Sequence, residues 1–330
     1  MERSLLKCQR LRALATPDGI IAAVAMDQRK SLRQMIAKAA GLDSGAVPDS
    51  QLAEFKAEVA RVLTGNGTSA ILLDPEYGLE AAPLRNPGCG LLMTYEADGF
   101  ENPRPHRMLE LLPHMSVGRL RTAGAGAVKI LLSWAPDDDD AANDCKRALI
   151  ERIGGECKGL DMPFFLEPVV YDPAGTDPRS FEFARQKPAL VLRTIEEFSK
   201  PYYQVDILKI EFPVHAAFVE GSSVYCGRRA HSMEEALDHF RAADSAARLP
   251  YIFLSAGITI LEFTESLRLA ADAGARFSGV LCGRANWQGG VASYVRGGPD
   301  AFREWLESDG LKNVRRVNDC LRRATSWERV

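Results

Sequence analysis

The chain has 330 residues, of which 46% are hydrophobic, so it can bury a substantial core and does not resemble a disordered chain. Its formal net charge of -3 excludes a strong overall attraction to nucleic acid or to an anionic membrane. A local basic pocket that binds a phosphate group remains compatible with this charge.

The seven cysteines are odd in number and include no CxxC pair, which argues against a disulfide framework and against a zinc ribbon. The first 15 residues, MERSLLKCQRLRALA, lack the uninterrupted apolar core of a signal peptide. No apolar run approaches the roughly 18 residues that span a bilayer. We therefore expect a cytoplasmic protein with reduced thiols.

Eight short apolar runs follow one another along the chain and predict β-strands. Near-continuous apolar runs of this length are typical of parallel strands that are covered on both faces. The runs are residues 20–27, 69–74, 90–96, 127–134, 163–171, 205–213, 251–257 and 279–284.

Helical patterns lie between the apolar runs. We expect helices at residues 31–40, 51–63, 108–123, 143–158, 188–199, 232–246 and 261–273. Several of them end near a glycine, as at Gly41, Gly124 and Gly274. The alternation of strands and helices predicts an α/β fold, and eight strands are the number that closes a (β/α)₈ TIM barrel.

A doubly wound open sheet is the alternative fold, but no GxGxxG motif follows the first run. No linker divides the sequence. We therefore predict one TIM-barrel domain over residues 1–330. An N-terminal helix and the helical segment after Gly298 are then decorations of the barrel.

Polar residues inside or at the end of these apolar runs are the candidates for chemistry. In a TIM barrel the active site lies at the carboxyl ends of the strands. The candidates are Asp27, Asp74, Glu96, Lys129, Glu167, Lys209, Glu211, Ser255 and Arg284.

Lys209 stands out because strand alternation places it on one face with Val205, Ile207 and Glu211. Desolvation among such neighbours disfavours the ammonium form, and a neutral amine is the form that attacks a carbonyl to make an imine. A structural ion pair with a carboxylate at a strand end is the competing interpretation.

Lys129 is a second lysine in a predicted strand, within the sequence AVKILL. Two inward lysines repel, so one can be the nucleophile while the other stays charged and orients a substrate oxygen. An ion pair with Asp27 or Glu167 is the structural alternative. Spacing alone does not decide which lysine has which role.

Glu167 lies between Phe165 and Val169 on its strand face, where a carboxyl group can take and return protons or serve as a fixed counter-ion. Asp27 ends the first run, where it can orient a lysine, bind substrate hydroxyl groups or cap the following helix.

The last two runs end in the sequences SAG and CGR and predict a phosphate site, because loops after strands seven and eight commonly hold phosphate in these barrels. Gly257 and Gly283 permit close approach of the backbone, Ser255 offers a hydroxyl group, and Arg284 offers a bidentate guanidinium. The five histidines show no HxH or HExxH spacing, so we expect no metal site.

The sequence resembles the class I, Schiff-base-forming tagatose 1,6-bisphosphate aldolases, with sulfofructose-phosphate aldolases as relatives. The similar stretches occur in order over nearly the whole chain. They are AMDQR (25–29), ILLDPEYGL (71–79), AVKILLSW (127–134), IERIGGECK (150–158), PFFLEPVVYD (163–172), EFSKPYYQVDILKIEFPV (197–214), YIFLSAGI (251–258) and GVLCGRANW (279–287).

The resemblance implies that Lys209 forms the imine and that Glu167 shuttles the proton. It also implies a small sugar phosphate as the ligand, no cofactor or metal, and a possible homo-oligomer. The positions that it assigns to substrate binding are Asp27, Gln28, Arg29, Lys129, Ser255, Gly257, Gly283 and Arg284.

Three functions are open at this point. The first is cleavage of a ketohexose bisphosphate, either tagatose 1,6-bisphosphate or a stereoisomer such as fructose 1,6-bisphosphate, to dihydroxyacetone phosphate and glyceraldehyde 3-phosphate. The second is cleavage of 6-deoxy-6-sulfofructose 1-phosphate, because Pro168 resembles the sulfofructose-phosphate aldolases. The long basic segment 219–232 leaves the far end of the substrate open, and its Arg228 and Arg229 either contact a second anion or are solvated. The third is a sugar-phosphate-binding regulatory protein without turnover.

Overall fold

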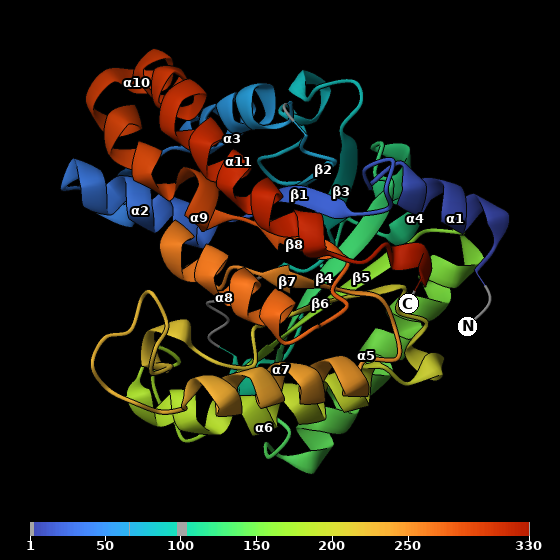
Figure 1. Cartoon of the computed structure of the whole chain (residues 1–330). Helices are drawn as coiled ribbons and strands as arrows, with labels where there is room; N and C mark the ends of the chain where they lie inside the picture. Colours follow the sequence, from blue (N-terminus) through green and yellow to red (C-terminus); the bar gives the residue numbers. More distant parts are fainter. Residues whose placement is uncertain (1–2, 66, 98–103, 330) are drawn as a thin grey trace.

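The computed structural model describes residues 3–65, 67–97 and 104–329. Its parallel strands close into a barrel in the order β1 to β8, which confirms the predicted TIM barrel (Figure 1). The strands are β1 (Ile21–Met26), β2 (Ala70–Leu73), β3 (Gly90–Thr94), β4 (Ala127–Trp134), β5 (Phe164–Val170), β6 (Ile207–Ile210), β7 (Tyr251–Leu254) and β8 (Gly279–Cys282).

Side chains of the strands alternate between the barrel interior and the helix layer. In β1, Ile21, Ala23 and Ala25 belong to the apolar cluster inside the barrel, whereas Val24 and Met26 belong to the larger cluster beneath the helices. Because both faces are buried, each strand consists almost wholly of apolar residues. The interior is therefore a packed core, and polar side chains are found towards the carboxyl ends of the strands.

The N-terminal helix α1 (Leu5–Arg12) closes the amino end of the barrel. Leu11 and Leu14 are fully buried in the interior cluster. Lys7 anchors the helix, because its Nζ lies 2.8 Å from a carboxylate oxygen of the buried Asp206 at the start of β6. This end of the barrel is therefore shut, and access is restricted to the opposite end.

Helices that follow the strands form the outer layer (Figure 1). They are α2 (Lys30–Ala40), α3 (Asp49–Leu63), α4 (Val117–Thr122), α5 (Asp140–Gly159), α6 (Phe181–Phe198), α7 (Met233–Ala246), α8 (Ile260–Asp272) and α9 (Arg284–Trp287). Serine and threonine caps begin several of them. The hydroxyl groups of Ser232 and Thr259 each accept a bond from a backbone N–H and form a capping box.

The C-terminal segment continues as α10 (Val291–Trp305), a π-helical turn (Leu306–Gly310) and α11 (Leu311–Cys320). The ring of Phe302 stacks on Phe55 of α3, with 4.0 Å between ring centroids. The predicted helical decorations at both termini are therefore present. Within the described residues, no helix is both long and apolar enough to cross a membrane.

The predicted helix at residues 108–123 is wrong over its first half. Only Val117–Thr122 is helical, and its cap is Ser116, whose hydroxyl group accepts a bond from Arg119 N. Pro113 lies just before this cap, and proline both lacks an N–H donor and blocks a helix that would pass through it. Leu111 instead forms an antiparallel bridge with Glu96.

Two other boundaries differ because capping residues lie upstream of the apolar pattern. The helix predicted from residue 188 begins at Phe181, after the cap Ser180, and Pro188 lies inside it. The helix predicted from residue 143 begins at Asp140, and Asp139 accepts a bond from Ala142 N. The acidic run 137–140 therefore includes the cap and the first residue of α5.

Candidate active site

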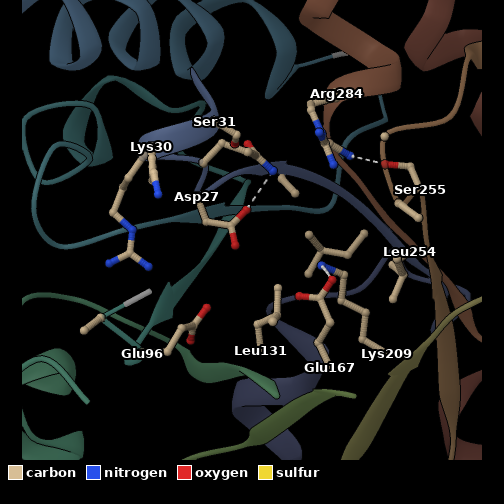
Figure 2. Close-up of a pocket in the computed structure, with 18 residues that line it drawn as sticks. Asp27, Lys30, Ser31, Glu96, Leu131, Glu167, Lys209, Leu254, Ser255 and Arg284 are labelled. Carbon is tan, nitrogen blue, oxygen red and sulfur yellow. Dashed lines mark hydrogen bonds and ion pairs between the residues drawn. The ribbon is translucent and has the colours of Figure 1, made fainter. Parts of the chain in front are cut away.

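A cavity opens at the carboxyl ends of the strands (Figure 2). Its lining comes from residues in or just after β1, β3, β4, β5, β6, β7 and β8. Polar members of the lining are Asp27, Gln28, Arg29, Lys30, Ser31, Glu96, Glu167, Lys209, Ser255 and Arg284. The barrel thus brings together nearly all the site residues that the sequence predicts.

Lys129 lies beneath this cavity and is fully buried. Its Nζ is 2.9 Å from Asp27 Oδ2, 2.9 Å from Glu96 Oε1 and 2.7 Å from Glu167 Oε2. Asp27 Oδ2 and Glu96 Oε1 each accept a hydrogen bond from the ammonium group, and Glu167 is a third ion-pair partner. Burial lowers the pKa of Lys129, but the three carboxylates outweigh burial and raise the pKa well above its ordinary value. Lys129 is therefore held as an ammonium ion.

Lys209 faces the cavity from β6 and is 4% exposed. Its Nζ lies 2.7 Å from Glu167 Oε1, so Glu167 bridges the two lysines through its two carboxylate oxygens. Figure 2 shows the side chains of Glu167 and Lys209 directed at one another. The amine that is predicted to be the nucleophile is thus in direct contact with the predicted proton shuttle.

Asp27 serves as a counter-ion rather than as a helix cap. The cap position of α2 is occupied by Arg29, without a side-chain hydrogen bond. Burial raises the pKa of Asp27, but the charges of Lys129 and Lys209 outweigh burial and hold it well below its ordinary value. Asp27 is therefore a carboxylate, and it also accepts a bond from Gln28 Nε2 at 3.1 Å.

Arg29 lines the same side of the cavity and donates to Glu76 Oε2 at 2.6 Å. Burial lowers the pKa of Arg29, but nearby carboxylates, Glu96 first among them, raise it overall. Gln28 approaches Gly283 closely, because a Cβ atom added at Gly283 would lie 3.0 Å from Gln28 Nε2. The end of β1 is therefore in contact with the end of β8.

The predicted phosphate residues lie together at the ends of β7 and β8. Ser255 Oγ accepts a bond from Gly283 N at 3.4 Å, and Arg284 lies beside Ser255 in Figure 2. Ala256 and Gly257 both have positive φ angles, of 47° and 75°. A Cβ atom at Gly257 would lie 2.5 Å from the central carbon of the Arg284 guanidinium, so the guanidinium packs directly on the backbone of the turn.

Glu96 is part of the site although the sequence did not single it out for a role. It lines the cavity from the end of β3, is 1% exposed and contacts Lys129. The sequence does show Glu96 as an acidic residue at the end of a predicted strand. Glu211 lies in a similar position in the sequence but outside the cavity, so this position alone does not identify a site residue.

Glu211 follows the end of β6 at Ile210, so strand alternation no longer directs its side chain. It contacts Lys187 at 3.1 Å and accepts a bond from Val170 N at 2.8 Å. The prediction that Glu211 shares the inward face with Lys209 is therefore wrong. Its network instead fastens β5, β6 and α6 to one another.

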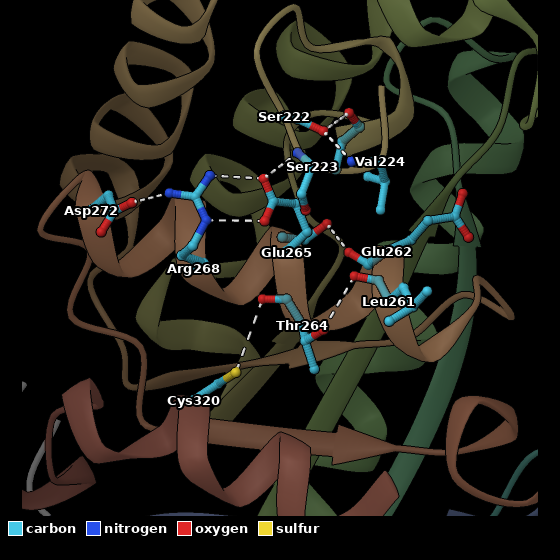
Figure 3. A network of polar contacts seen from close by, with 12 residues as sticks. Ser222, Ser223, Val224, Leu261, Glu262, Thr264, Glu265, Arg268, Asp272 and Cys320 are labelled. Atoms are coloured by element: carbon cyan, nitrogen blue, oxygen red, sulfur yellow. Dashed lines mark hydrogen bonds and ion pairs between the residues drawn. The ribbon is translucent and has the colours of Figure 1, made fainter. Parts of the chain in front are cut away.

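The basic segment 219–232 is attached to α8 and lies outside the lining of the cavity (Figure 3). Ser223 N donates to Glu265 Oε1 at 3.0 Å, and Arg268 donates to both oxygens of that carboxylate. These bonds lower the pKa of Glu265 to about 2. Arg228 and Arg229 pair with surface carboxylates of Glu182 and Glu220, at 3.4 and 3.1 Å.

Metal ligands are not clustered in the described part of the chain, where no group of three or more His, Cys, Asp or Glu side chains is arranged to hold an ion. The three carboxylates that converge at the site are bound to Lys129.

Comparison with known proteins shows the family of the chain. The model of the DeoC/LacD family of aldolases matches residues 21–289. A tagatose 1,6-diphosphate aldolase of Staphylococcus aureus is 44% identical over 329 residues, which are 99% of each chain.

Solved structures show the same fold. A fructose-bisphosphate aldolase from Plasmodium falciparum superimposes with a TM-score of 0.70 at 12% identity, over 98% of this chain and 97% of that chain. A Schiff-base-forming fructose-1,6-bisphosphate aldolase gives a TM-score of 0.53 at 15% identity, over 92% of this chain and 99% of that chain. Sequence similarity over the full length, together with the barrel, identifies the chain as a lyase that belongs to the DeoC/LacD family of aldolases.

Proposed function

We propose that the protein cleaves a ketohexose bisphosphate, tagatose 1,6-bisphosphate or a stereoisomer such as fructose 1,6-bisphosphate, through a Schiff base on Lys209. The products are dihydroxyacetone phosphate and glyceraldehyde 3-phosphate. The similarity to tagatose 1,6-diphosphate aldolase supports this class of substrate.

The observation that carries the proposal is the different environment of the two buried lysines. Lys129 forms ion pairs with three carboxylates, and its raised pKa makes it a poor nucleophile. Lys209 lines the cavity and contacts Glu167, a base to which it can transfer a proton. We therefore assign attack on the carbonyl carbon to Lys209 and a fixed positive charge to Lys129.

Imine formation uses the Lys209–Glu167 pair. Glu167 takes a proton from the ammonium of Lys209, and the amine attacks C2 of the open-chain ketose. Glu167 then returns a proton to the C2 hydroxyl group of the carbinolamine, which leaves as water. The nitrogen stays bonded to C2 as a protonated imine, which is an electron sink for the next step.

Cleavage uses Glu167 a second time as a base. It removes the proton of the C4 hydroxyl group, the C3–C4 bond breaks, and the electron pair moves into the imine to give an enamine. The aldehyde leaves, C3 of the enamine is protonated, and hydrolysis of the resulting imine releases dihydroxyacetone phosphate. Lys129, 2.7 Å from Glu167 Oε2, stabilises the carboxylate form of Glu167 in each cycle.

The phosphate group on C1 is assigned to the turn at Ser255 and Gly257 and to Gly283 and Arg284. The guanidinium of Arg284 and the hydroxyl group of Ser255 provide charge-assisted and neutral hydrogen bonds there. Fixing the phosphate at the ends of β7 and β8 holds C2 next to Lys209 on the neighbouring strand β6.

Substitution of Lys209 by methionine tests the proposal. We expect kcat for release of glyceraldehyde 3-phosphate, followed with a coupled dehydrogenase, to fall by about four orders of magnitude. Lys7→Met is the matched control, because it also breaks a buried ion pair but lies at the closed end of the barrel. Near-normal turnover of the Lys209 variant would contradict the assignment.

Two other functions give different results in the same assay. A higher kcat/KM for 6-deoxy-6-sulfofructose 1-phosphate than for the bisphosphates would identify a sulfofructose-phosphate aldolase. Thermal stabilisation of the wild-type protein by a ketose bisphosphate without product formation would identify a binding protein.

A further inference from the structure

Among the described residues, Glu96 Oε2 at the cavity wall has neither a hydrogen bond nor an ion pair. Glu96 is 1% exposed, and its Oε1 contacts Lys129 at 2.9 Å. Its Oε2 is buried and makes no hydrogen bond to any of the described residues. A buried polar atom without a partner costs free energy, and at a cavity wall such an atom can bind water or a ligand group.

Glu96 lies across the barrel from the residues that are assigned to phosphate binding. Glu96 follows β3, Ser255 follows β7, and these strands are diametrically opposite in a closed ring of eight. Figure 2 shows Glu96 and Lys30 on one side of the cavity and Ser255 and Arg284 on the other. A ketose that is bound by its C1 phosphate at β7 and β8 therefore extends its other half towards Glu96.

Glu96 suits contact with a hydroxyl group. Burial raises its pKa, and the charges of Lys129 and Arg29 oppose this rise without cancelling it. A carboxyl group in this state can accept a hydrogen bond or, when protonated, donate one. Its position is fixed, because the backbone of Glu96 pairs with that of Leu111 and Oε1 is held by Lys129.

We propose that Glu96 is a specificity-determining residue that binds, through Oε2, a hydroxyl group of the half of the ketose that leaves as the aldehyde. This inference rests on the proposed function. It assigns to Glu96 a role in cleavage of the whole ketose, in addition to the support that its other oxygen gives to Lys129.

Dihydroxyacetone phosphate separates these two roles, because it lacks the departing half. Through the imine and the enamine, the enzyme exchanges a C3 proton of dihydroxyacetone phosphate with solvent without any aldehyde. A residue that only supports Lys129, and through it Glu167, affects this exchange and cleavage alike. A residue that contacts the departing half affects cleavage alone.

The experiment compares Glu96→Ala and Glu96→Gln with the wild type, using steady-state cleavage of a ketohexose bisphosphate and proton exchange of dihydroxyacetone phosphate in D₂O by NMR. We expect Glu96→Ala to lower kcat/KM for cleavage by about 10- to 100-fold. The exchange rate should fall by a clearly smaller factor, because the variant removes only one of the three carboxylates around Lys129. Glu96→Gln keeps the volume of the side chain and should lose less, so it also serves if the alanine variant does not fold.

Glu58→Gln is the control for loss of a buried carboxylate, since Glu58 is 4% exposed, pairs with Arg303 and lies outside the cavity. Equal losses of cleavage and exchange in the Glu96 variants would overturn the inference in favour of a supporting role. Unchanged cleavage would overturn it as well. A wild-type protein that shows neither exchange nor cleavage would overturn the proposed function and this inference with it.

Discussion

Two buried lysines inside the barrel have opposite chemical characters because their partners differ. Lys129 is surrounded by three carboxylates, whereas Lys209 shares one of these, Glu167, and reaches the cavity. The sequence could place both residues in strands, but it could not assign their roles. The number of carboxylates around each amine depends on which strand ends meet across the barrel.

The contact between Gly257 and Arg284 gives a prediction at the residue scale. Gly257→Ala places a Cβ atom 2.5 Å from the guanidinium carbon, so Arg284 must move. We expect KM for a phosphorylated ketose to rise by about tenfold or more, because a charge-assisted contact to phosphate is displaced. Steady-state kinetics and competition by inorganic phosphate measure this change.

Gly274→Ala is the matched control for backbone strain. Gly274 has a φ angle of 78°, close to the 75° of Gly257, but a Cβ atom there meets nothing within 4 Å. Both substitutions therefore lower the free energy of unfolding by about 1 kcal/mol through the left-handed backbone. If both raised KM equally, or neither did, the role assigned to the Gly257–Arg284 contact would be wrong.

At the scale of elements, a buried lysine on α3 fixes the loop that carries Asp27. Lys56 Nζ donates to Met26 O at 2.8 Å and to Gln28 O at 2.7 Å, the carbonyl groups on either side of Asp27. It also pairs with Asp74 at 2.5 Å, and both side chains are fully buried. The end of β1 is thereby tied to α3 and to the end of β2.

Substitution of Lys56 by methionine should leave Asp74 as an uncompensated buried charge. We expect the free energy of unfolding to fall by about 3–5 kcal/mol, measured by urea denaturation. The double variant Lys56→Met with Asp74→Asn removes the charge as well, so it should recover part of this loss. A single variant as stable as the wild type, or a double variant less stable than the single, would contradict this account of the loop.

Element boundaries were predictable where the cap and the apolar pattern coincide and were wrong where they do not. The helix after β7 follows its capping residue Thr259 directly. For α6 the cap Ser180 lies well before Pro188, so the prediction of a helix that begins at the proline is wrong. Near Pro113 the apolar spacing suggested a helix that the missing N–H group forbids. The spacing of apolar residues therefore predicts a helix boundary correctly only where capping residues and prolines agree with it.

At the scale of the molecule, the number of predicted strands was enough to predict most of the fold and of the site. Once eight parallel strands close into a ring, polar residues at their carboxyl ends must converge, which brought Asp27, Glu167 and Lys209 together. Lys56 was missed because it lies on a helix, where a lysine is ordinarily solvated. Its burial depends on how α3 packs against β1 and β2, which a single sequence does not encode in any short pattern.

The sequence also could not predict how deep Lys129 lies in the barrel. Residues of neighbouring strands are staggered by the barrel, so two inward lysines can lie at different heights. Lys209 lines the cavity, whereas Lys129 lies below it among carboxylates. The predicted contact of Lys129 with substrate stays a prediction. Because Lys129 is not part of the cavity lining, we expect it to act on the substrate through its partners Asp27, Glu96 and Glu167.

The assignment of the imine to Lys209 is the central claim, and borohydride trapping tests it most directly. The protein is incubated with dihydroxyacetone phosphate and EDTA, reduced with borohydride, digested and mapped by peptide mass spectrometry. The account predicts a covalent adduct on the peptide that carries Lys209 and an unmodified Lys129. An adduct on Lys129, or no adduct on a protein shown to be folded, would contradict it.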